Sequence, residues 1–346
     1  MISWFFVEWG QRDKRVWHNA RMSIENDSAL ADLAYQKAAL NLVSRTFAIT
    51  IPLLPPIIER AAGCAYLLCR IVDTIEDASC LSVTEKVGLS ELFLAACLNQ
   101  KPISEFVQAC NKALELHPNL AERDLIAHTA TVVRILHRCP ANQQSAILRC
   151  ITIMSEGMAR FHAKQNPLGL KNLQEFEEYC YVVAGVVGEM LTSLFTAHSP
   201  PFAQAIAKQE SLAIAFGQAL QMTNILKDSL DDQARGVSWL PQNSTHAELL
   251  ALAIQKLDAA LAYILYIPKA EIGMRRFCLL ALGLAVLTLD KLASDEKITA
   301  IHPNKISRRA VAWFYRFTKI AAHSNTLIQL FFYWATRPLK RMVARS

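Results

Sequence analysis

Long segments of helical periodicity, separated by single breaker residues, constrain the fold of this chain most strongly. From about residue 28 onward, apolar residues recur at spacings of three and four, which indicates helices. Only 11 glycines occur among the 346 residues, whereas a chain of strands needs turn residues every few positions. The sequence therefore predicts an all-α protein.

The breaks between periodic segments locate the expected helices. A first helix is capped by Asp27 or Ser28, and a second begins near Glu59 and runs past Asp77. Further helices are expected at roughly 84–98, 103–116, 120–137, 142–164, 172–197, 201–232, 246–265, 270–292 and 304–322. The connections are short and no repeat is visible, so we expect one domain over 1–346. Two segments, 210–226 and 277–289, are apolar almost all round, which is typical of helices inside a large bundle.

Charge and cysteine content narrow the class of protein. A net charge of +6 favours anionic substrates or an anionic membrane surface, and no basic-aromatic motif predicts a nucleic-acid partner. The nine cysteines are an odd number without a CxxC pair, which predicts free, mostly buried thiols and a cytoplasmic location. The N-terminal apolar run is too short for a secretory signal, and no uncharged apolar run reaches the roughly 18–20 residues of a membrane span.

The C-terminal segment 326–346 combines apolar, aromatic and basic residues. Leu327 to Trp334 is apolar and aromatic, and Arg337, Lys340 and Arg341 follow. Two readings stay open: a final helix packed on the core, or a helix resting on the cytoplasmic face of a membrane as a peripheral contact. The segment is too short to span a membrane.

The most informative residues form an acidic cluster at the end of an apolar segment. Asp73 and Asp77 stand four residues apart, so both point the same way on a helix, and Tyr66 and Arg70 share that face. Hard carboxylate oxygens at this spacing suit Mg²⁺ bridged to phosphates. Arg70 is either a plain salt-bridge partner or a bidentate diphosphate ligand.

A second acidic cluster follows about 150 residues later. Gln221, Asn224, Asp228 and Asp232 lie on one helical face at the end of another apolar segment, and we expect the two amides to contact substrate. One such cluster alone is usually solvated surface. Two of them, facing each other, would hold Mg²⁺ ions that neutralise a diphosphate leaving group.

Several motifs resemble the squalene/phytoene synthase family of trans-isoprenoid synthases over roughly 40–310. DTIED at 73–77 and NILKDSLDD at 224–232 resemble its two aspartate-rich motifs. SRTFA at 44–48, GMARF at 157–161 and YCYVVAGVVG at 179–188 also match. DTIED, YCYVVAGVVG and FCLLALGLAVLTL at 277–289 favour the squalene branch.

The resemblance implies a single-domain orthogonal helical bundle of the isoprenoid synthase fold, built around a deep central cavity. It implies that Asp73, Glu76, Asp77, Asp228 and Asp232 bind Mg²⁺ and diphosphate. Further implied site residues are Ser44, Arg45, Tyr66 and Arg70 at the diphosphates, Tyr179 beside the carbocation, and Val183, Val187 and Leu191 along the hydrocarbon tunnel. Without Tyr179, that apolar stripe reads as ordinary core.

The resemblance also implies an activity: head-to-head condensation of two farnesyl diphosphates through presqualene diphosphate, then reduction to squalene by NADPH. No GxGxxG motif follows a strand, so a dinucleotide fold is not expected. Lys305, Arg308 and Arg309 would bind the cofactor phosphates by resemblance, or would simply begin a solvated basic helix.

Two departures and three alternatives accompany this interpretation. Val237 stands where relatives often carry a second Arg, and Asp231 replaces a more usual Glu. Without reduction the product would be dehydrosqualene or hydroxysqualene, and C20 substrates would make the chain a phytoene synthase. A helical membrane-surface scaffold with decayed motifs is the rival from another class, against which the intact carboxylates argue.

Overall fold

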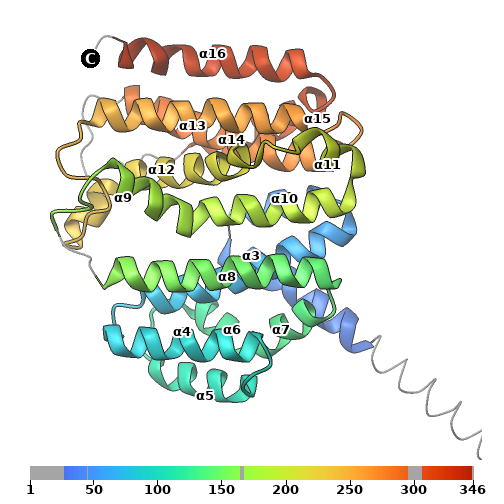
Figure 1. Ribbon diagram of the computed structural model, residues 1–346, viewed down its shortest axis with the longest axis vertical. Helices are drawn as coiled ribbons and strands as arrows, with labels where there is room; N and C mark the ends of the chain where they lie inside the picture. The colour runs from blue at the N-terminus through green and yellow to red at the C-terminus, as the bar shows by residue number, and fades with distance from the viewer. Residues whose placement is uncertain (1–26, 45, 164–166, 295–305, 345–346) are drawn as a thin grey trace, which may run out of the picture.

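The computed structural model describes residues 27–44, 46–163, 167–294 and 306–344, and these residues form helices stacked in layers (Figure 1). The described part contains no strand, only an isolated parallel bridge between Leu170 and Pro241. The all-α prediction is confirmed. The bounds of the first helices are 27–43, α2 (Phe47–Thr50), the 3₁₀ turn η1 (Ile51–Leu53), α3 (Pro56–Asp77), α4 (Val83–Cys97) and α5 (Ile103–Ala113).

Helix α3 is the central element of the lower half. Its first residue is Pro56, whose missing N–H costs nothing at this position. Ile58, Leu67 and Ile71 are completely buried, and the helix ends at Asp77, where Ala78 turns to extended backbone. Burial of this apolar length fixes the depth at which the carboxylates of the helix end sit.

The lower half is completed by α6 (Leu120–Ala127), α7 (Thr129–His137) and α8 (Ala141–His162). The predicted helix over 120–137 is thus two helices that meet at His128, whose ψ of 16° departs from helical geometry. Helices α3, α4, α7 and α8 pack together, and a capping box between Ser82 and Glu85 begins α4.

The upper half contains α9 (Leu173–Cys180), the π-helical turn η2 (Tyr181–Gly185), α10 (Val186–His198), α11 (Pro200–Ile206), α12 (Glu210–Ala234), α13 (His246–Tyr266) and α14 (Ile272–Ser294). The predicted helix over 201–232 is broken at Lys208, whose φ is +69°. Gly217 lets α12 cross the π turn closely, because a Cβ there would collide with the carbonyl oxygen of Ala184.

The last two helices are α15 (Arg308–Ala321) and α16 (Asn325–Val343), with α16 packed on α13 and α14 (Figure 1). Ile328, Phe332 and Leu339 form the buried inner face of α16. Arg275 is fully buried and donates to the carbonyl oxygen of Ile267 and to Oδ1 of Asn325, each at 2.6 Å. This guanidinium joins the beginnings of α14 and α16.

The structure also shows the state of the cysteines and the hydropathy of the longest helices. All nine cysteines are free and seven are buried, as the sequence predicts. Three described helical stretches, Leu173–His198, His246–Tyr266 and Ile272–Ala293, are long and apolar enough to cross a membrane by length and composition. Of the most apolar window in the last stretch, 72% is buried within the bundle.

Candidate active site

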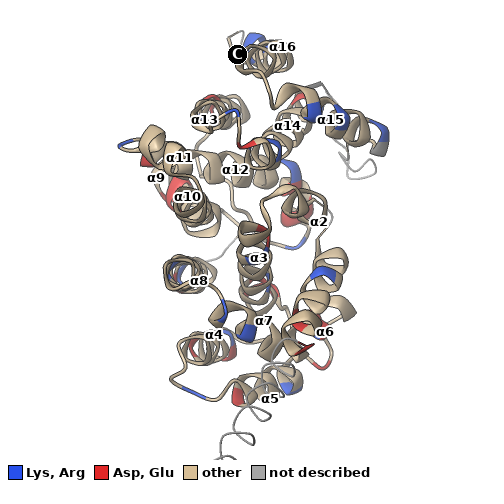
Figure 2. Cartoon of the chain, turned by 90° about the vertical axis from the view of Figure 1, so that its right-hand side faces the viewer, with Lys and Arg blue, Asp and Glu red and all other residues tan. Residues whose placement is uncertain are grey.

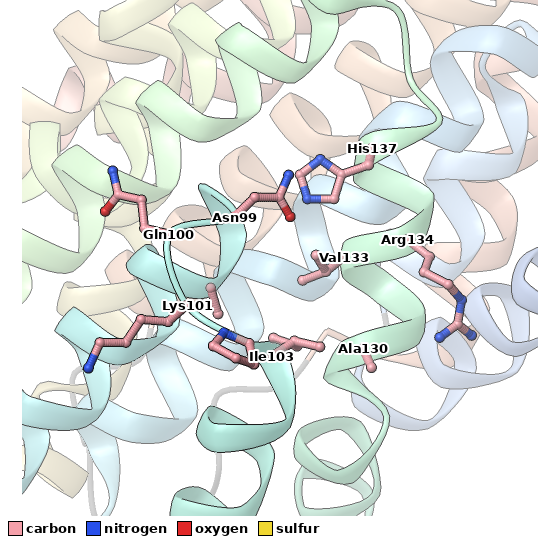
Figure 3. A pocket seen from close by; sticks show the side chains of 10 residues that line it. Asn99, Gln100, Lys101, Ile103, Ala130, Val133, Arg134 and His137 are labelled. Atoms are coloured by element: carbon pink, nitrogen blue, oxygen red, sulfur yellow. The ribbon is translucent and has the colours of Figure 1, made fainter.

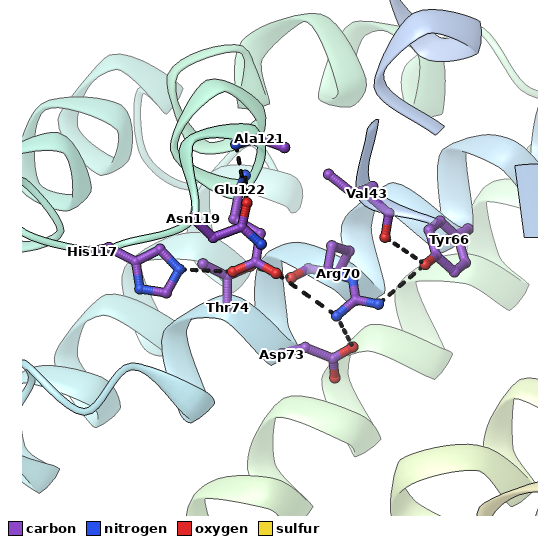
Figure 4. A network of polar contacts seen from close by, with 9 residues as sticks. All are labelled: Val43, Tyr66, Arg70, Asp73, Thr74, His117, Asn119, Ala121 and Glu122. Carbon is purple, nitrogen blue, oxygen red and sulfur yellow. Dashed lines mark hydrogen bonds and ion pairs between the residues drawn. The ribbon is translucent and has the colours of Figure 1, made fainter. Parts of the chain in front are cut away.

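The end of α3 places the first acidic cluster beside a network of polar groups (Figure 4). Nη2 of Arg70 donates to the hydroxyl of Tyr66 at 3.2 Å, and that hydroxyl donates to the carbonyl oxygen of Val43 at 3.2 Å. Nη1 of Arg70 lies 4.0 Å from both Oδ2 of Asp73 and Oε1 of Glu122. Nε of Arg70 is buried without a hydrogen-bond partner, which leaves a donor free for an incoming anion.

The carboxylates at this end are poorly compensated. Burial raises the pKa of Asp73 to about 7, because Asp77 and Glu122 add to the desolvation and Arg70 offsets only part of it. Asp77 is exposed at the end of the helix, yet desolvation by the surrounding atoms raises the pKa of its carboxyl, against the lowering effect of Arg70, Lys86 and Arg235. Carboxylates held in this way need an additional cation, so they fit a hard metal ion.

Glu76 occupies a different environment from the two aspartates. Its side chain is buried, Oε1 accepts from the hydroxyl of Ser90 on α4 at 3.1 Å, and Oε2 has no hydrogen-bond partner. Nζ of Lys86 donates to the Glu76 carbonyl oxygen. These contacts hold the end of α3 against α4, and the predicted role of Glu76 as a metal ligand stays a prediction.

The end of α12 carries the second acidic cluster. Asp228 is partly buried and its Oδ2 lies 3.1 Å from Nζ of Lys227, while Asp232 is buried and paired with Nη2 of Arg235. Burial raises the pKa of Asp232, and Asp228 adds to this, against the lowering effect of Arg235. Gln221 is partly buried and Asn224 is exposed.

The two helix ends lie within electrostatic range of each other. Arg235, at the end of α12, lowers the pKa of Asp77, at the end of α3. Tyr179 is buried and its pKa is raised well above the usual value, first by desolvation and then by Asp77 and, more weakly, by Asp73 and Asp232. The buried phenol therefore lies within electrostatic range of both acidic clusters.

Aromatic side chains surround Tyr179. Its ring stacks on the indole of Trp239 with centroids 4.2 Å apart and planes inclined by 4°, and Phe161 meets it edge-on at 5.2 Å. The His162 ring lies 5.2 Å from the same indole. Sequence reasoning singled out neither Trp239 nor His162. The only signal was their position, Trp239 after the second acidic cluster and His162 directly after GMARF.

A contact between two loops holds Trp239 in place. The N–H of Leu170 donates to the carbonyl oxygen of Leu240 at 3.0 Å, and the N–H of Gln242 donates back to Leu170 at 2.7 Å. Gly169 makes this approach feasible, because its φ is +84° and a Cβ would collide with the Leu240 oxygen. Trp239 is thereby kept buried against Tyr179.

The remaining predicted residues are distributed around this centre. Ser44 is buried and its hydroxyl accepts from the N–H of Phe47 at 2.9 Å, and the Phe47 ring packs on Tyr66 at 5.2 Å. Val183, Val187 and Leu191 are partly buried against the core, on the π turn and α10. Their tunnel role stays a prediction.

The predicted cofactor residues are only partly visible. Lys305 lies outside the described residues, as does Arg45, which was predicted to contact the diphosphates. Arg308 begins α15, and Arg309 is exposed in its first turn, where Ser307 caps the helix. An exposed cation at the start of a helix is suited to binding an anionic phosphate. The assignment of these residues to NADPH stays a prediction.

Two pockets are described, and neither contains a predicted site residue. The larger lies between the α4–α5 connection and α7, with Asn99, Gln100 and His137 among its lining side chains (Figure 3). The smaller is lined from α5 and α6. The central cavity implied by the resemblance stays a prediction.

The carboxylates of the acidic ends have the chemistry to hold divalent metal ions. Among the described side chains, no three His, Cys, Asp or Glu groups are placed to hold one ion together. Mg²⁺ bound to phosphates commonly takes only one or two protein carboxylates and keeps several waters. Asp73 and Asp77 on one side, and Asp228 and Asp232 on the other, match that pattern as two half-sites.

Comparison with known proteins identifies the family. The squalene/phytoene synthase family model matches residues 40–249, more than half of the chain. The chain belongs to the squalene/phytoene synthase family. Its resemblance in the sequence motifs is therefore confirmed, and the acidic ends and Tyr179 lie in the segment that matches this family.

Individual relatives agree with this assignment. Squalene synthase ERG9 of Gibberella zeae is 30% identical over 230 residues, which cover 66% of this chain and 47% of that one. Human squalene synthase is 27% identical over 296 residues, covering 80% of this chain and 67% of that one. The chain thus spans about half the length of several curated relatives that it matches.

A solved structure confirms the fold. The complex of TcSQS with the ligand BPH1237 superposes with a TM-score of 0.67 at 21% sequence identity, covering 90% of this chain and 99% of that one. This similarity confirms the isoprenoid synthase fold. Members of the family are prenyltransferases.

Proposed function

We propose that the chain is a squalene synthase, which joins two farnesyl diphosphates head to head through presqualene diphosphate and reduces the product with NADPH to squalene. The observation that carries the proposal is a buried tyrosine within electrostatic range of two acidic helix ends. An enzyme that ionises an allylic diphosphate needs anion-binding groups beside an aromatic, water-poor region, and this arrangement provides both.

The position of each site residue indicates its role in the reaction. Arg70, with its free Nε, and Tyr66 bind the leaving diphosphate beside Asp73. Asp73, Asp77, Asp228 and Asp232 would hold Mg²⁺, which would supply positive charge to neutralise this leaving group. Because Arg70 contacts Asp73 from its own helix, it keeps that carboxylate oriented before substrate arrives.

Tyr179 and Trp239 are assigned to the allylic carbon of the bond that breaks, rather than to the diphosphate. Their stacked rings present π faces that stabilise an allylic cation, and the Tyr179 hydroxyl can hold or pass a proton. The raised pKa of Tyr179 keeps the phenol neutral, so it does not trap the cation as a phenolate. Val183, Val187 and Leu191 would line the hydrocarbon chains.

Product analysis tests the proposal directly. The protein is incubated with Mg²⁺ and either farnesyl diphosphate or its C20 homologue, with and without NADPH, and the products are identified by mass. Squalene formed only with NADPH supports the full reaction. Presqualene diphosphate, dehydrosqualene or hydroxysqualene in all conditions overturns the reductive step, and conversion of only C20 substrate overturns the choice of substrate.

A matched pair of variants tests the site. Asp232→Asn removes a carboxylate of the second cluster, whereas Glu105→Gln removes an exposed carboxylate on α5. We expect Asp232→Asn to lower product formation by at least about a hundredfold, and Glu105→Gln to leave it unchanged.

The substrates and product are lipids, so we also propose that the enzyme works at the cytoplasmic face of a membrane.

A further inference from the structure

The outer faces of α15 and α16 expose large apolar side chains that nothing in the described structure covers. Trp313 is 59% and Ile320 is 67% exposed on α15, while Leu330, Tyr333 and Trp334 are 59%, 66% and 74% exposed on α16. Single exposed apolar residues are ordinary, but five on two neighbouring helices are not. We name these five residues, with the cations described next, the aromatic–basic face.

Cations occupy the same helical faces. Arg316 and Lys319 lie beside Trp313 and Ile320 in the helical repeat, and Arg337 and Arg341 follow Trp334 at spacings of three and four. All four are exposed. No ion pair joins Arg316, Arg337 or Arg341 to another described residue, whereas the neighbouring Lys340 is paired with Asp258 at 2.8 Å.

The two faces lie at one end of the molecule. Helix α16 is the outermost layer, α15 flanks it, and both helices carry lysines and arginines (Figure 2). The rings of Phe314 and Phe317 on α15 pack on the ring of Phe331 on α16, with centroids 5.0 and 4.9 Å apart. These contacts fix the two helices to each other. The inner face of α16 is already used by the bundle.

The positive charge of residues 306–344 indicates what kind of partner binds the aromatic–basic face. Residues 306–344 contain seven Lys and Arg and no Asp or Glu, although the whole chain has a net charge of only +6. A second copy placed face to face would bring like charges together, which is unfavourable. An anionic lipid surface satisfies both the cations and the Trp and Tyr rings, which prefer the level of the headgroups.

We infer that α15 and α16 together dock the protein on anionic phospholipid, with Trp313, Tyr333 and Trp334 entering the headgroup region. This surface extends the predicted tail, 326–346, to a second helix, and the contact is peripheral. The inference deepens the proposed membrane location but requires no catalytic step, so an inactive chain would still bind vesicles. Failure of vesicle binding therefore leaves the proposed reaction intact, and failure of the reaction leaves the docking surface intact.

Flotation of the full chain with vesicles tests the docking surface. One set of vesicles contains phosphatidylcholine alone, and the other adds phosphatidylglycerol. Arg337→Gln with Arg341→Gln removes two cations from the face, and Tyr333→Ser with Trp334→Ser removes its rings. Matched controls at the opposite end of the bundle are Lys101→Gln with Lys112→Gln, and Leu116→Ser with Leu120→Ser, all at exposed positions.

We expect selective binding to the anionic vesicles and loss of that binding at high salt. Each removed cation should weaken it roughly fivefold, so the arginine pair should cost at least about tenfold, and the ring pair a similar amount. Both controls should bind like the unchanged protein. Thermal melts confirm that the variants fold.

Three outcomes overturn the inference. Equal binding to both vesicle types would show that anionic lipid is not required. Equal losses of binding in the control variants would show that α15 and α16 are not the docking surface. If the chain forms a dimer that only the face variants dissociate, as measured by sedimentation, the face is an interface between copies instead.

Discussion

The ring of Tyr179 lies parallel to the indole of Trp239, with centroids 4.2 Å apart and planes inclined by 4°. Both residues are buried, and they come from segments separated by a helical turn, α10, α11 and α12. The stack keeps the tyrosine ring in one orientation near the carboxylates of both helix ends. The orientation of the phenol therefore depends on a residue that bears no charge of its own.

Trp239→Leu should separate stability from product formation. Removing the indole leaves a void beside Tyr179, so we expect the free energy of unfolding to fall by about 2–4 kcal/mol. We also expect slower turnover and a larger share of side products, because the phenol gains freedom. Urea unfolding and product analysis check this, with the exposed Trp334→Leu as control for the loss of an indole. Unchanged products in a stable Trp239→Leu variant would contradict the assigned role.

Asp73→Asn should change activity and stability in opposite directions. Burial and acidic neighbours raise the pKa of Asp73 to about 7, so at pH 8 the folded protein maintains an unfavourable charge. An amide removes that cost, and we expect a gain in the free energy of unfolding of about 1–3 kcal/mol without metal. Product formation should fall at least about a hundredfold.

The pH profile of unfolding provides the sign check for Asp73. The folded state binds the proton more tightly than the unfolded state, whose pKa is near 3.8. The native chain should therefore gain stability relative to Asp73→Asn as the pH falls from about 8 to 4, and the two should converge at low pH. A constant difference between them across this range would show that Asp73 is not strained by burial.

The sequence allowed the two acidic faces to be predicted because i,i+4 spacing is local. Asp73 with Asp77, and Asp228 with Asp232, lie on helix ends as expected. Trp239 was missed because its position depends on the contact between Leu170 and Leu240, which are 70 residues apart in sequence. Long-range backbone pairing leaves no periodic signal in a single sequence.

Local breaks in the helices were also beyond the reach of pattern analysis. The π turn between α9 and α10 keeps the apolar periodicity nearly intact, so 172–197 read as one helix. The break at Lys208 has a left-handed φ without a glycine to signal it. The π turn packs against α12, a long-range contact that one segment of sequence does not reveal.

His162 should make the protein sensitive to acid. Burial and the nearby Lys86 lower the pKa of its ring to about 4, from 6.5 when exposed. The unfolded chain then binds the proton more tightly, so stability should be complete above about pH 7 and fall as the pH drops toward 4. Relative to His162→Gln, the native chain should lose about 1–3 kcal/mol over this range in urea unfolding. Parallel pH profiles for the two proteins would contradict the assigned burial.

Gly169→Ala should disturb the site from a distance. The φ of +84° is costly for alanine, and its Cβ would collide with the Leu240 oxygen, so we expect a loss of about 1–3 kcal/mol and a loosened Trp239. Gly88→Ala is the matched control, because it lies inside α4 with open space around it and should stabilise the chain by roughly 0.5–1 kcal/mol.

The two glycine variants are compared by urea unfolding and by tryptophan fluorescence, with Trp239→Leu as background to isolate the signal of that indole. If Gly169→Ala alters the fluorescence only when Trp239 is present, the loop contact controls the aromatic stack. An unchanged signal together with normal product formation would mean that the Tyr179–Trp239 stack is maintained by the helices alone, since the loop pairing would then be dispensable.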